Sequence, residues 1–573
     1  MLSEPTGKAI GELLHGDARE GVRDLLTGPA ARAVVRQLGQ DRTTQFQAAG
    51  IGFSLGGGVS VPFEAHALDP TSPELTSDPV RRQHSGEGVW TVAGGGFYPH
   101  VSLGGNVPVG PGLTAGFDVS ASGGVGFKAI TQSPEGNADA AVRRAQTMPF
   151  EIPLDAGAAL ALRPGEEVQI AGNGRLAVGA NAGVGAQAGP VGASATVGFE
   201  GGASIGVGLT VKRREGSVVE VDVERLRGLE GRAGVNAQAG LPGFEILNAG
   251  ASVSGGRQQS TLRHYQFDLS DERAARAYGE LMRLNAGEAD RLSAEPTGPV
   301  RESTLSSTTR SQAVEGHARL AWWTLAEWTR SRRDDSQVLE GPEGLRAEAH
   351  SFNTHEASDG IFARNGRRMV DMSNITVSRP GQPSESHFHL RAELPDDPRT
   401  TSGDWQRWTA VASQVGALDE ANRAQLTRPE LLGAATARTI DLFLPQESME
   451  RLANLDPDRA AEAVRQAYTA LGDGDPPSRG EAREQAVRFS AAIRDYLQAA
   501  RTGDEDGMRA AMSRGVPLDE DVCRCIYAVA TLLGPDAILV NEASVTGRAR
   551  NGEAIDYRFH EDRIAAPDLR SQM

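Results

Sequence analysis

The feature that most constrains the fold is an alternation of side chains that runs without a break from Val191 to Val211. Every odd position in this stretch is apolar or glycine, and no even position is apolar. Successive side chains of a β-strand point to opposite faces, so the pattern predicts one strand with a dry face and a wet face. Ordinary strands have about 3 to 10 residues, and so long a strand predicts a tall sheet or barrel.

The same alternation recurs in neighbouring segments, at residues 51–67, 113–129 and 168–188. The connections between these segments are short and polar, which favours antiparallel hairpins over parallel pairing through crossover helices. Residues 51–260 also contain 41 of the 69 glycines of the chain. Glycine weakens a strand, so its repeated use indicates a close approach of another layer, strong coiling or bends at barrel corners.

The predicted fold class is mixed and mainly β: long antiparallel glycine-rich strands form a barrel or sandwich, with helical segments between and after the sheets. Six regions follow from the changes in composition and periodicity. They are a helical amino-terminal segment (1–48), a long-strand β domain (49–270), a helical linker (271–300), a second β region (301–395), a helical region (396–535) and a carboxy-terminal β-hairpin with a tail (536–573).

Two further expectations concern the order of these regions. The linker repeats the amino-terminal segment at a constant offset of 268 residues, with Gly279, Glu280 and Leu281 matching Gly11, Glu12 and Leu13. The repeat suggests a recurring unit of helix followed by sheet. The final hairpin, in contrast, is marginal on its own, and we expect it to join one of the earlier sheets.

Composition restricts the partners of the chain. A formal charge of −17 and a pI near 5.2 argue against nucleic acid and against electrostatic attraction to anionic lipid, since both need basic patches. The basic run from Arg330 to Arg333 is interpreted as a solvated loop. The amino terminus has no secretory signal pattern, which predicts a cytoplasmic protein or one exported without such a signal.

One group of residues has a pattern with chemical meaning. Five residues separate Gly381 from His387, and His389 and Glu393 follow on the same face of a predicted strand. This spacing resembles the first metal-binding motif of the cupin family, which would make His387, His389 and Glu393 ligands of a divalent metal. The closing glycine of that motif is absent, because Thr400 stands in its place.

The alternative to a metal site is a pair of surface histidines on a polar strand. His350 or His355 would have to complete the ligand set from a neighbouring strand. The stretch Gly202–Gly206 satisfies G-x-S-x-G, but it lies inside a strand and is assigned to chance. Cys523 and Cys525 are expected to pack in a helix rather than to bind metal. We therefore predict no catalytic residue and no cofactor.

Three functions remain open. The first is a non-enzymatic β-structural or binding protein, possibly a module of a larger bacterial secreted or toxin-like assembly, with an unknown protein or an apolar ligand as its partner. In this case the apolar face of residues 191–211 is buried, and Phe199→Asp unfolds or aggregates the protein. The second is a water-soluble pore former with amphipathic hairpins, for which phenylalanines ten residues apart, such as Phe117 and Phe127, would mark an apolar band. The third is a metal-dependent enzyme at the cupin-like motif.

Overall fold

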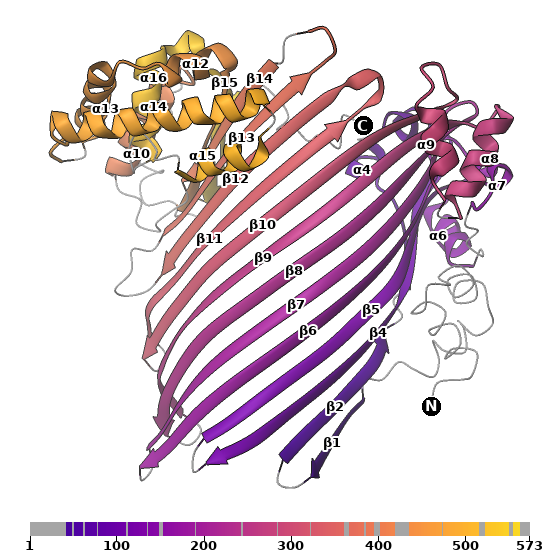
Figure 1. Cartoon of the computed structure of the whole chain (residues 1–573), viewed down its shortest axis with the longest axis horizontal. Coiled ribbons are helices and arrows are strands. Elements are labelled where there is room, and N and C mark those ends of the chain that lie inside the picture. Colours follow the sequence, from indigo (N-terminus) through magenta and orange to yellow (C-terminus); the bar gives the residue numbers. More distant parts are fainter. Residues whose placement is uncertain are drawn as a thin grey trace.

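The protein is mainly β, and its described strands form one antiparallel sheet in this computed structural model (Figure 1). The structure describes residues 42–561 except 49–50, 61–62, 77, 111–112, 135, 148–152, 189–190, 242–243, 284, 321–322, 360–365, 383–384, 395–401, 419–434, 473, 503, 515–521 and 549–553. The amino-terminal residues 1–41, with the first copy of the predicted repeat, lie outside the described part.

The strands follow one another in the sheet in the order of the chain, as a meander. Their bounds are β1 (Arg42–Ala48), β2 (Ile51–Ser60), β3 (Phe63–Ala67), β4 (Val89–Gly110), β5 (Leu113–Ser133), β6 (Glu167–Ala188), β7 (Val191–Arg213), β8 (Val218–Leu241), β9 (Phe244–Asp268), β10 (Val300–Leu320), β11 (Trp323–Glu340), β12 (Arg346–Asp359), β13 (Gly366–Ser378), β14 (Glu385–Leu394), β15 (Ala435–Pro445), β16 (Leu539–Arg548) and β17 (Ala554–Glu561). The predicted meander of antiparallel hairpins is thus confirmed.

Two of these strands occupy one place in the sheet. Both β2 and β3 pair with β4 in the same register, with Gly52 opposite Asn106 and Phe63 opposite Gly95. The sheet therefore has sixteen strand positions. Among the described residues β1 pairs only with β2 and β17 only with β16, so these two strands are the edges of an open sheet.

The two ends of the long strands differ in how they are connected. At one end, which we call the hairpin rim, two-residue connections join β1 to β2, β4 to β5, β6 to β7, β8 to β9 and β10 to β11. At the opposite end, the helical rim, longer connections contain α4 (Pro73–Thr76), α5 (Pro79–Gln83), α6 (Ala138–Thr147), α7 (Ala156–Ala161), α8 (Glu272–Leu281) and α9 (Gly287–Ser293). Figure 1 shows these helices gathered at the upper right, above a sheet whose lower half carries none.

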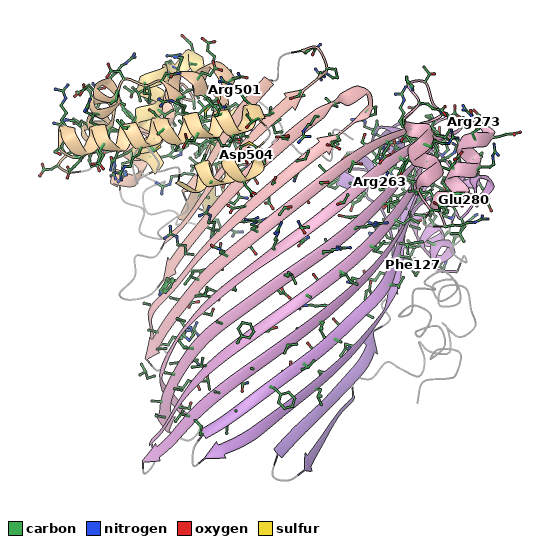
Figure 2. The ribbon with its side chains drawn as sticks, viewed as in Figure 1. Phe127, Arg263, Arg273, Glu280, Arg501 and Asp504 are labelled. Atoms are coloured by element: carbon green, nitrogen blue, oxygen red, sulfur yellow. The ribbon has the colours of Figure 1, made fainter. Side chains whose placement is uncertain are left out.

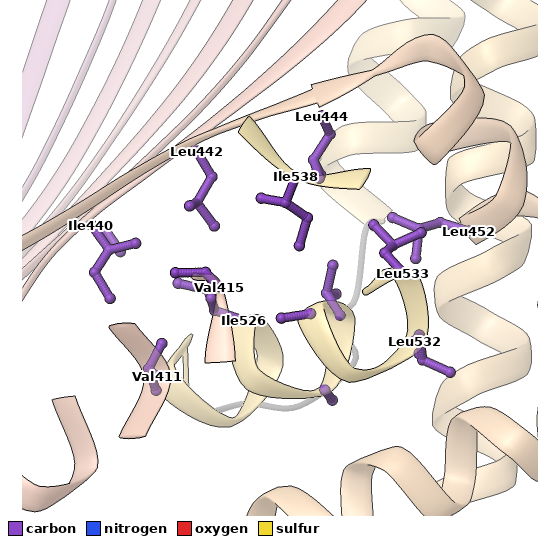
Figure 3. Close-up of a cluster of buried hydrophobic side chains, with 14 of the residues drawn as sticks. Val411, Val415, Ile440, Leu442, Leu444, Leu452, Ile526, Leu532, Leu533 and Ile538 are labelled. Carbon is purple, nitrogen blue, oxygen red and sulfur yellow. The ribbon is translucent and has the colours of Figure 1, made fainter. Parts of the chain in front are cut away.

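A second group of helices forms a body on the last strands. It consists of α10 (Ser402–Gln414), α12 (Gln446–Ala453), α13 (Pro457–Leu471), α14 (Arg479–Thr502), α15 (Glu505–Arg514) and α16 (Val522–Leu533). Its core packs Val411, Leu452 and Ile526 against Ile440 and other side chains from one face of β15 (Figure 3), and the buried Trp408 belongs to the same cluster. Within the predicted helical region, α13 begins after Asp456, whose side chain accepts from two backbone N–H groups, and ends at Gly472, which has a φ of 70°.

Several expectations about individual segments are corrected or confirmed. Residues 42–48 form β1, so the helical amino-terminal segment does not extend to residue 48. The alternation of apolar residues from Ala318 to Trp328 predicts a single strand, but β10 ends at Leu320 and β11 begins at Trp323. The run Arg330–Arg333 lies within β11 and is not a loop. The last hairpin does join the earlier sheet, through the pairing of β16 with β15.

The glycines of the strands make room for side chains that lie flat on the sheet. A Cβ on Gly96 or Gly126 would come within 2.6 Å of the Tyr98 side chain, and a Cβ on Gly316 would come equally close to the Trp328 ring. Close approach is therefore part of the reason for glycine at these positions, but the neighbour is a ring of the same sheet rather than a second layer.

Candidate functional site

The long strands give the sheet two chemically different faces. Odd positions of β7 pair with even positions of β6, and the register continues so that Phe199, Ala180 and Ala233 lie side by side. We call this side the apolar face and the opposite side the polar face. Because the alternation stays in register from β4 to β11, each face keeps its character across the sheet.

The apolar face is exposed over its middle and lower part. Of the 19 large hydrophobic side chains that are exposed among the described residues, 15 lie on this face. We call these 15 the apolar field: Leu103, Leu113, Phe117, Leu176, Val178, Val184, Val197, Phe199, Ile205, Val207, Leu229, Val235, Leu247, Val253 and Trp328. Figure 2 shows the side chains of the lower strands with no layer of the protein in front of them.

This exposure overturns the prediction that the apolar face of residues 191–211 is buried. Phe199 is 60% exposed and Ile205 is 66% exposed, whereas Val211, under the helices of the rim, is 1% exposed. The alternation correctly separated the two faces. The prediction was wrong because it assumed a second layer of protein, and no described element covers this part of the face.

The same face is buried where helices cover it. At the helical rim, Val211, Val221, Tyr265 and Phe267 pack against α8 and α9. On the same face, near the last strands of the sheet, the side chains of β15 pack into the helical body: Ile440, Leu442 and Leu444. The apolar field is the uncovered area between these two contacts, and it extends to the hairpin rim.

The height of the apolar field along the strands fits the hydrocarbon layer of a membrane. On β7, exposed apolar side chains reach from Val197 to Val207. Ten residues at about 3.4 Å each, in a strand tilted by roughly 40°, rise about 26 Å. The lipid-facing band of a membrane β-barrel is about 25 Å tall.

The polar face opposite the apolar field carries charged pairs that bridge strands. Arg175 of β6 pairs with Glu230 of β8 across the intervening β7, and Gly202 of β7 leaves the space through which Glu230 passes. Arg232 of β8 lies 3.3 Å from Glu315 of β10. These partly exposed pairs make the polar face compatible with water and not with lipid.

At the helical rim a short segment lies across the polar face. Leu75 of α4 packs with Trp90, Val92 and Ile130 of the sheet. Arg81 of α5 is paired with Glu167 of β6. The segment of residues 68–88, which we call the rim segment, therefore crosses the ends of several strands on this side.

The rim segment is held by charges. Asp78 is paired with Lys212 and lies 3.4 Å from Arg214. Burial acts to raise the pKa of Asp78, but the hydrogen bond and charge of Lys212 outweigh it and hold the pKa below its usual value. His84 lies 2.7 Å from Glu215 and 2.8 Å from Glu87, and these two carboxylates raise the pKa of the imidazole above its usual value.

The residues of the cupin-like motif lie on β14, with His387, His389 and Glu393 on the polar face by register. The side chains of His387 and Glu393 are outside the described part. His389 is buried and is already engaged: its Nε2 pairs with Asp441, and its Nδ1 lies 3.1 Å from Ser373 Oγ. Asn541 donates to the other carboxylate oxygen of Asp441 at 2.9 Å.

The proposed supplementary ligands do not converge on this group. His350 lies on the opposite face of the sheet from His389, while His355 shares the row of Glu393 on the polar face. Within the described side chains there is no cluster of three residues able to hold a metal ion. The motif, with its divalent metal, stays a prediction for His387, His389 and Glu393.

Ser373, His389 and Asp441 also have the residue types of a hydrolytic triad. A triad needs N–H groups directed at the oxygen of the reacting carbonyl. Here the three residues lie in paired strands, whose register directs the backbone N–H groups into the ladder. In the described part of the chain this group is therefore a polar contact between neighbouring strands.

A group of arginines on the apolar face was missed by the sequence reasoning. Arg225 and Arg227 of β8, Arg257 of β9, Arg310 of β10, and Arg330 and Arg332 of β11 lie on this face, directly beyond the apolar field in the direction of the helical rim. The available signal was arginine at every second position in two of the strands. The register between four strands is needed to bring them together.

No protein-family model matches the chain, and no curated protein matches it. Among solved structures, one described as a Pseudomonas aeruginosa FadL homologue aligns with 7% identity over 73% of this chain and 86% of that chain, with a TM-score of 0.21. A score this low supports no argument about fold or function. Among the described helices, none is both long and apolar enough to cross a membrane.

Proposed function

We propose that the long-strand sheet inserts into a lipid bilayer and forms the wall of a water-filled pore. The apolar face contacts the lipid chains, the polar face lines the water, and the helices of the rim and the helical body stay on one side of the membrane. The single observation that carries this proposal is the exposure of the apolar field over a height of about 26 Å.

Three further observations support a pore over a carrier of a small apolar ligand. The exposed apolar surface spans eight neighbouring strands, far more than one small ligand would cover. The opposite face carries bridging ion pairs, as the lining of an aqueous channel does. The sheet has an even number of strand positions, so β1 and β17 would meet as antiparallel neighbours if the sheet closed on itself.

The proposal is tested by probing single positions for lipid. In a chain with Cys523→Ala and Cys525→Ala, single cysteines at Val197, Phe199 and Ile205 and at Thr196, Gly198 and Ser204 are labelled with an environment-sensitive fluorophore. After addition to liposomes, the first three labels should be quenched by nitroxide lipids and the second three by aqueous iodide. Dye release should accompany this pattern.

The assay includes a control label outside the sheet and has two results that would contradict the proposal. A label at Arg479 of α14, on the exposed surface of the helical body, should respond to iodide only. If the labels of the apolar face respond to neither quencher, or if both faces respond to iodide alike, the sheet does not face lipid. In that case a binding protein that buries the apolar field against a partner becomes the better interpretation.

A further inference from the structure

We infer that the arginines beyond the apolar field bind the phosphate groups of anionic phospholipids. This arginine belt comprises Arg225, Arg227, Arg257, Arg310, Arg330 and Arg332. The inference rests on the proposed membrane insertion and adds to it the lipid class and the depth of insertion. It contradicts the expectation from net charge, because a chain of charge −17 concentrates positive charge on this one area.

The arrangement of the belt points to an anionic ligand. Arg257 and Arg310 are direct cross-strand partners, and like charges in such a pair destabilise a sheet. Arg225, Arg227 and Arg257 are exposed, and no described carboxylate pairs with any of them. A phosphate between guanidinium groups would offset this repulsion through paired N–H···O hydrogen bonds.

By register two carboxylates lie on this face beside the belt: Asp334 opposite Arg310, and Glu356, whose side chain is outside the described part, opposite Arg330. Asp334 is the register partner of Arg310, yet its ion pair is formed with Arg332, at 3.4 Å. The Nε of Arg310 is buried and has no hydrogen-bond partner among the described residues. The centre of the belt, formed by Arg227, Arg257 and Arg310, thus has donors available for a ligand.

The position of the belt identifies the ligand as a headgroup. On β8 and β11 the last members of the apolar field before the belt are Leu229 and Trp328, two residues from Arg227 and Arg330. Tryptophan marks the boundary between hydrocarbon and headgroups in membrane proteins, and arginine extends from that boundary to phosphates. With the apolar field in hydrocarbon, the belt lies at the headgroup level on the side of the helical rim.

The test compares two triple variants of the full-length chain. Arg227→Gln, Arg257→Gln, Arg310→Gln neutralises the centre of the belt, and Arg479→Gln, Arg483→Gln, Arg488→Gln removes the same charge from the exposed face of α14. Flotation measures binding to phosphatidylcholine vesicles with and without phosphatidylglycerol. Each basic residue near an anionic surface contributes on the order of 1 kcal/mol, so the belt variant should bind the anionic vesicles about a hundredfold more weakly.

The outcomes separate this inference from the proposed function. We expect both triple variants to bind pure phosphatidylcholine as the parent does, and the α14 variant to keep the parent's preference for phosphatidylglycerol. If the parent binds both kinds of vesicle equally, or if the two variants lose equal affinity for the anionic vesicles, the arginine belt does not bind anionic headgroups. Either result is still compatible with the proposed insertion. Binding to neither vesicle by the parent would instead contradict insertion itself. Thermal unfolding of the belt variant without vesicles should occur at or above the parent's temperature, since a like-charge pair has been removed.

Discussion

The helical body and the lower half of the sheet use apolar side chains in opposite ways. In the helical body Trp408, Val411 and Val464 are fully buried, and apolar residues recur with helical spacing. In the sheet Phe199 and Ile205 are more than half exposed although their pattern is as regular. Regular amphipathic patterning therefore establishes that two faces differ, but it does not establish that protein covers the apolar one.

The largest expected difference concerns stability in water. Trp408→Ala should destabilise the helical body by about 3–5 kcal/mol, because a buried ring is lost and a cavity remains. Phe199→Ala should change stability by less than about 0.5 kcal/mol, as at other exposed sites. Denaturant unfolding followed by circular dichroism measures both. Similar losses in the two variants would mean that Phe199 is buried by a contact absent from the described chain.

In a membrane, substitutions on the exposed apolar face of the sheet are expected to have the large effect that core substitutions have in water. Ile205→Arg should weaken insertion by about 2–4 kcal/mol, the cost of a basic side chain near the middle of the lipid face of a barrel. Ser204→Arg, one residue away on the polar face, should insert as the parent does. Dye release as a function of protein concentration gives both values. Equal losses from the two substitutions would contradict the assignment of the faces.

Replacing glycine by alanine should change stability in opposite directions in a strand of the sheet and in a helix. Gly126→Ala should cost about 1–3 kcal/mol, since its Cβ would lie 2.5 Å from the Tyr98 hydroxyl. Gly279→Ala in α8 should stabilise by up to about 1 kcal/mol, because its Cβ meets nothing within 4 Å and alanine favours the helix. Thermal unfolding of the two variants provides the check. A neutral Gly126→Ala would show that Tyr98 moves aside without cost.

The smallest effect is expected at the rim segment. The hydrogen bonds of His84 to Glu215 and Glu87 raise its pKa above 6.5 in the folded protein. Because the pKa of His84 is higher in the folded than in the unfolded protein, its protonation stabilises the fold in full at pH values below the unfolded pKa. This stabilisation is lost as the pH rises through the folded pKa. NMR titration of His84 should give a value above 6.5, and Glu215→Gln should lower it. An unchanged value in that variant would mean that the contact with Glu215 is not formed in solution.

Much of the sheet could be predicted from local pattern. The alternation placed a strand at 191–211, and β7 spans Val191–Arg213. The break between β10 and β11 was missed because apolar residues continue in phase through Ala321 and Trp322, and neither residue is a typical turn former. The exposure of the apolar field could not be predicted, because burial depends on which layers pack together. The arginine belt likewise depends on the register of four successive strands, whose belt residues run from Arg225 to Arg332 in the sequence.

The two-residue connections of the hairpin rim bear on the route of the chain into a membrane. Their residues are Ala49 and Gly50, Pro111 and Gly112, Gly189 and Pro190, Pro242 and Gly243, and Ala321 and Trp322. None of these ten residues can ionise, so under the proposed insertion these five connections would bring no charge into the hydrocarbon. The opposite rim carries Asp78, Arg81 and Glu215 on its connections and is attached to folded helices. Under the proposed insertion, this difference favours entry with these five connections first, while the helices remain in the compartment from which the protein enters.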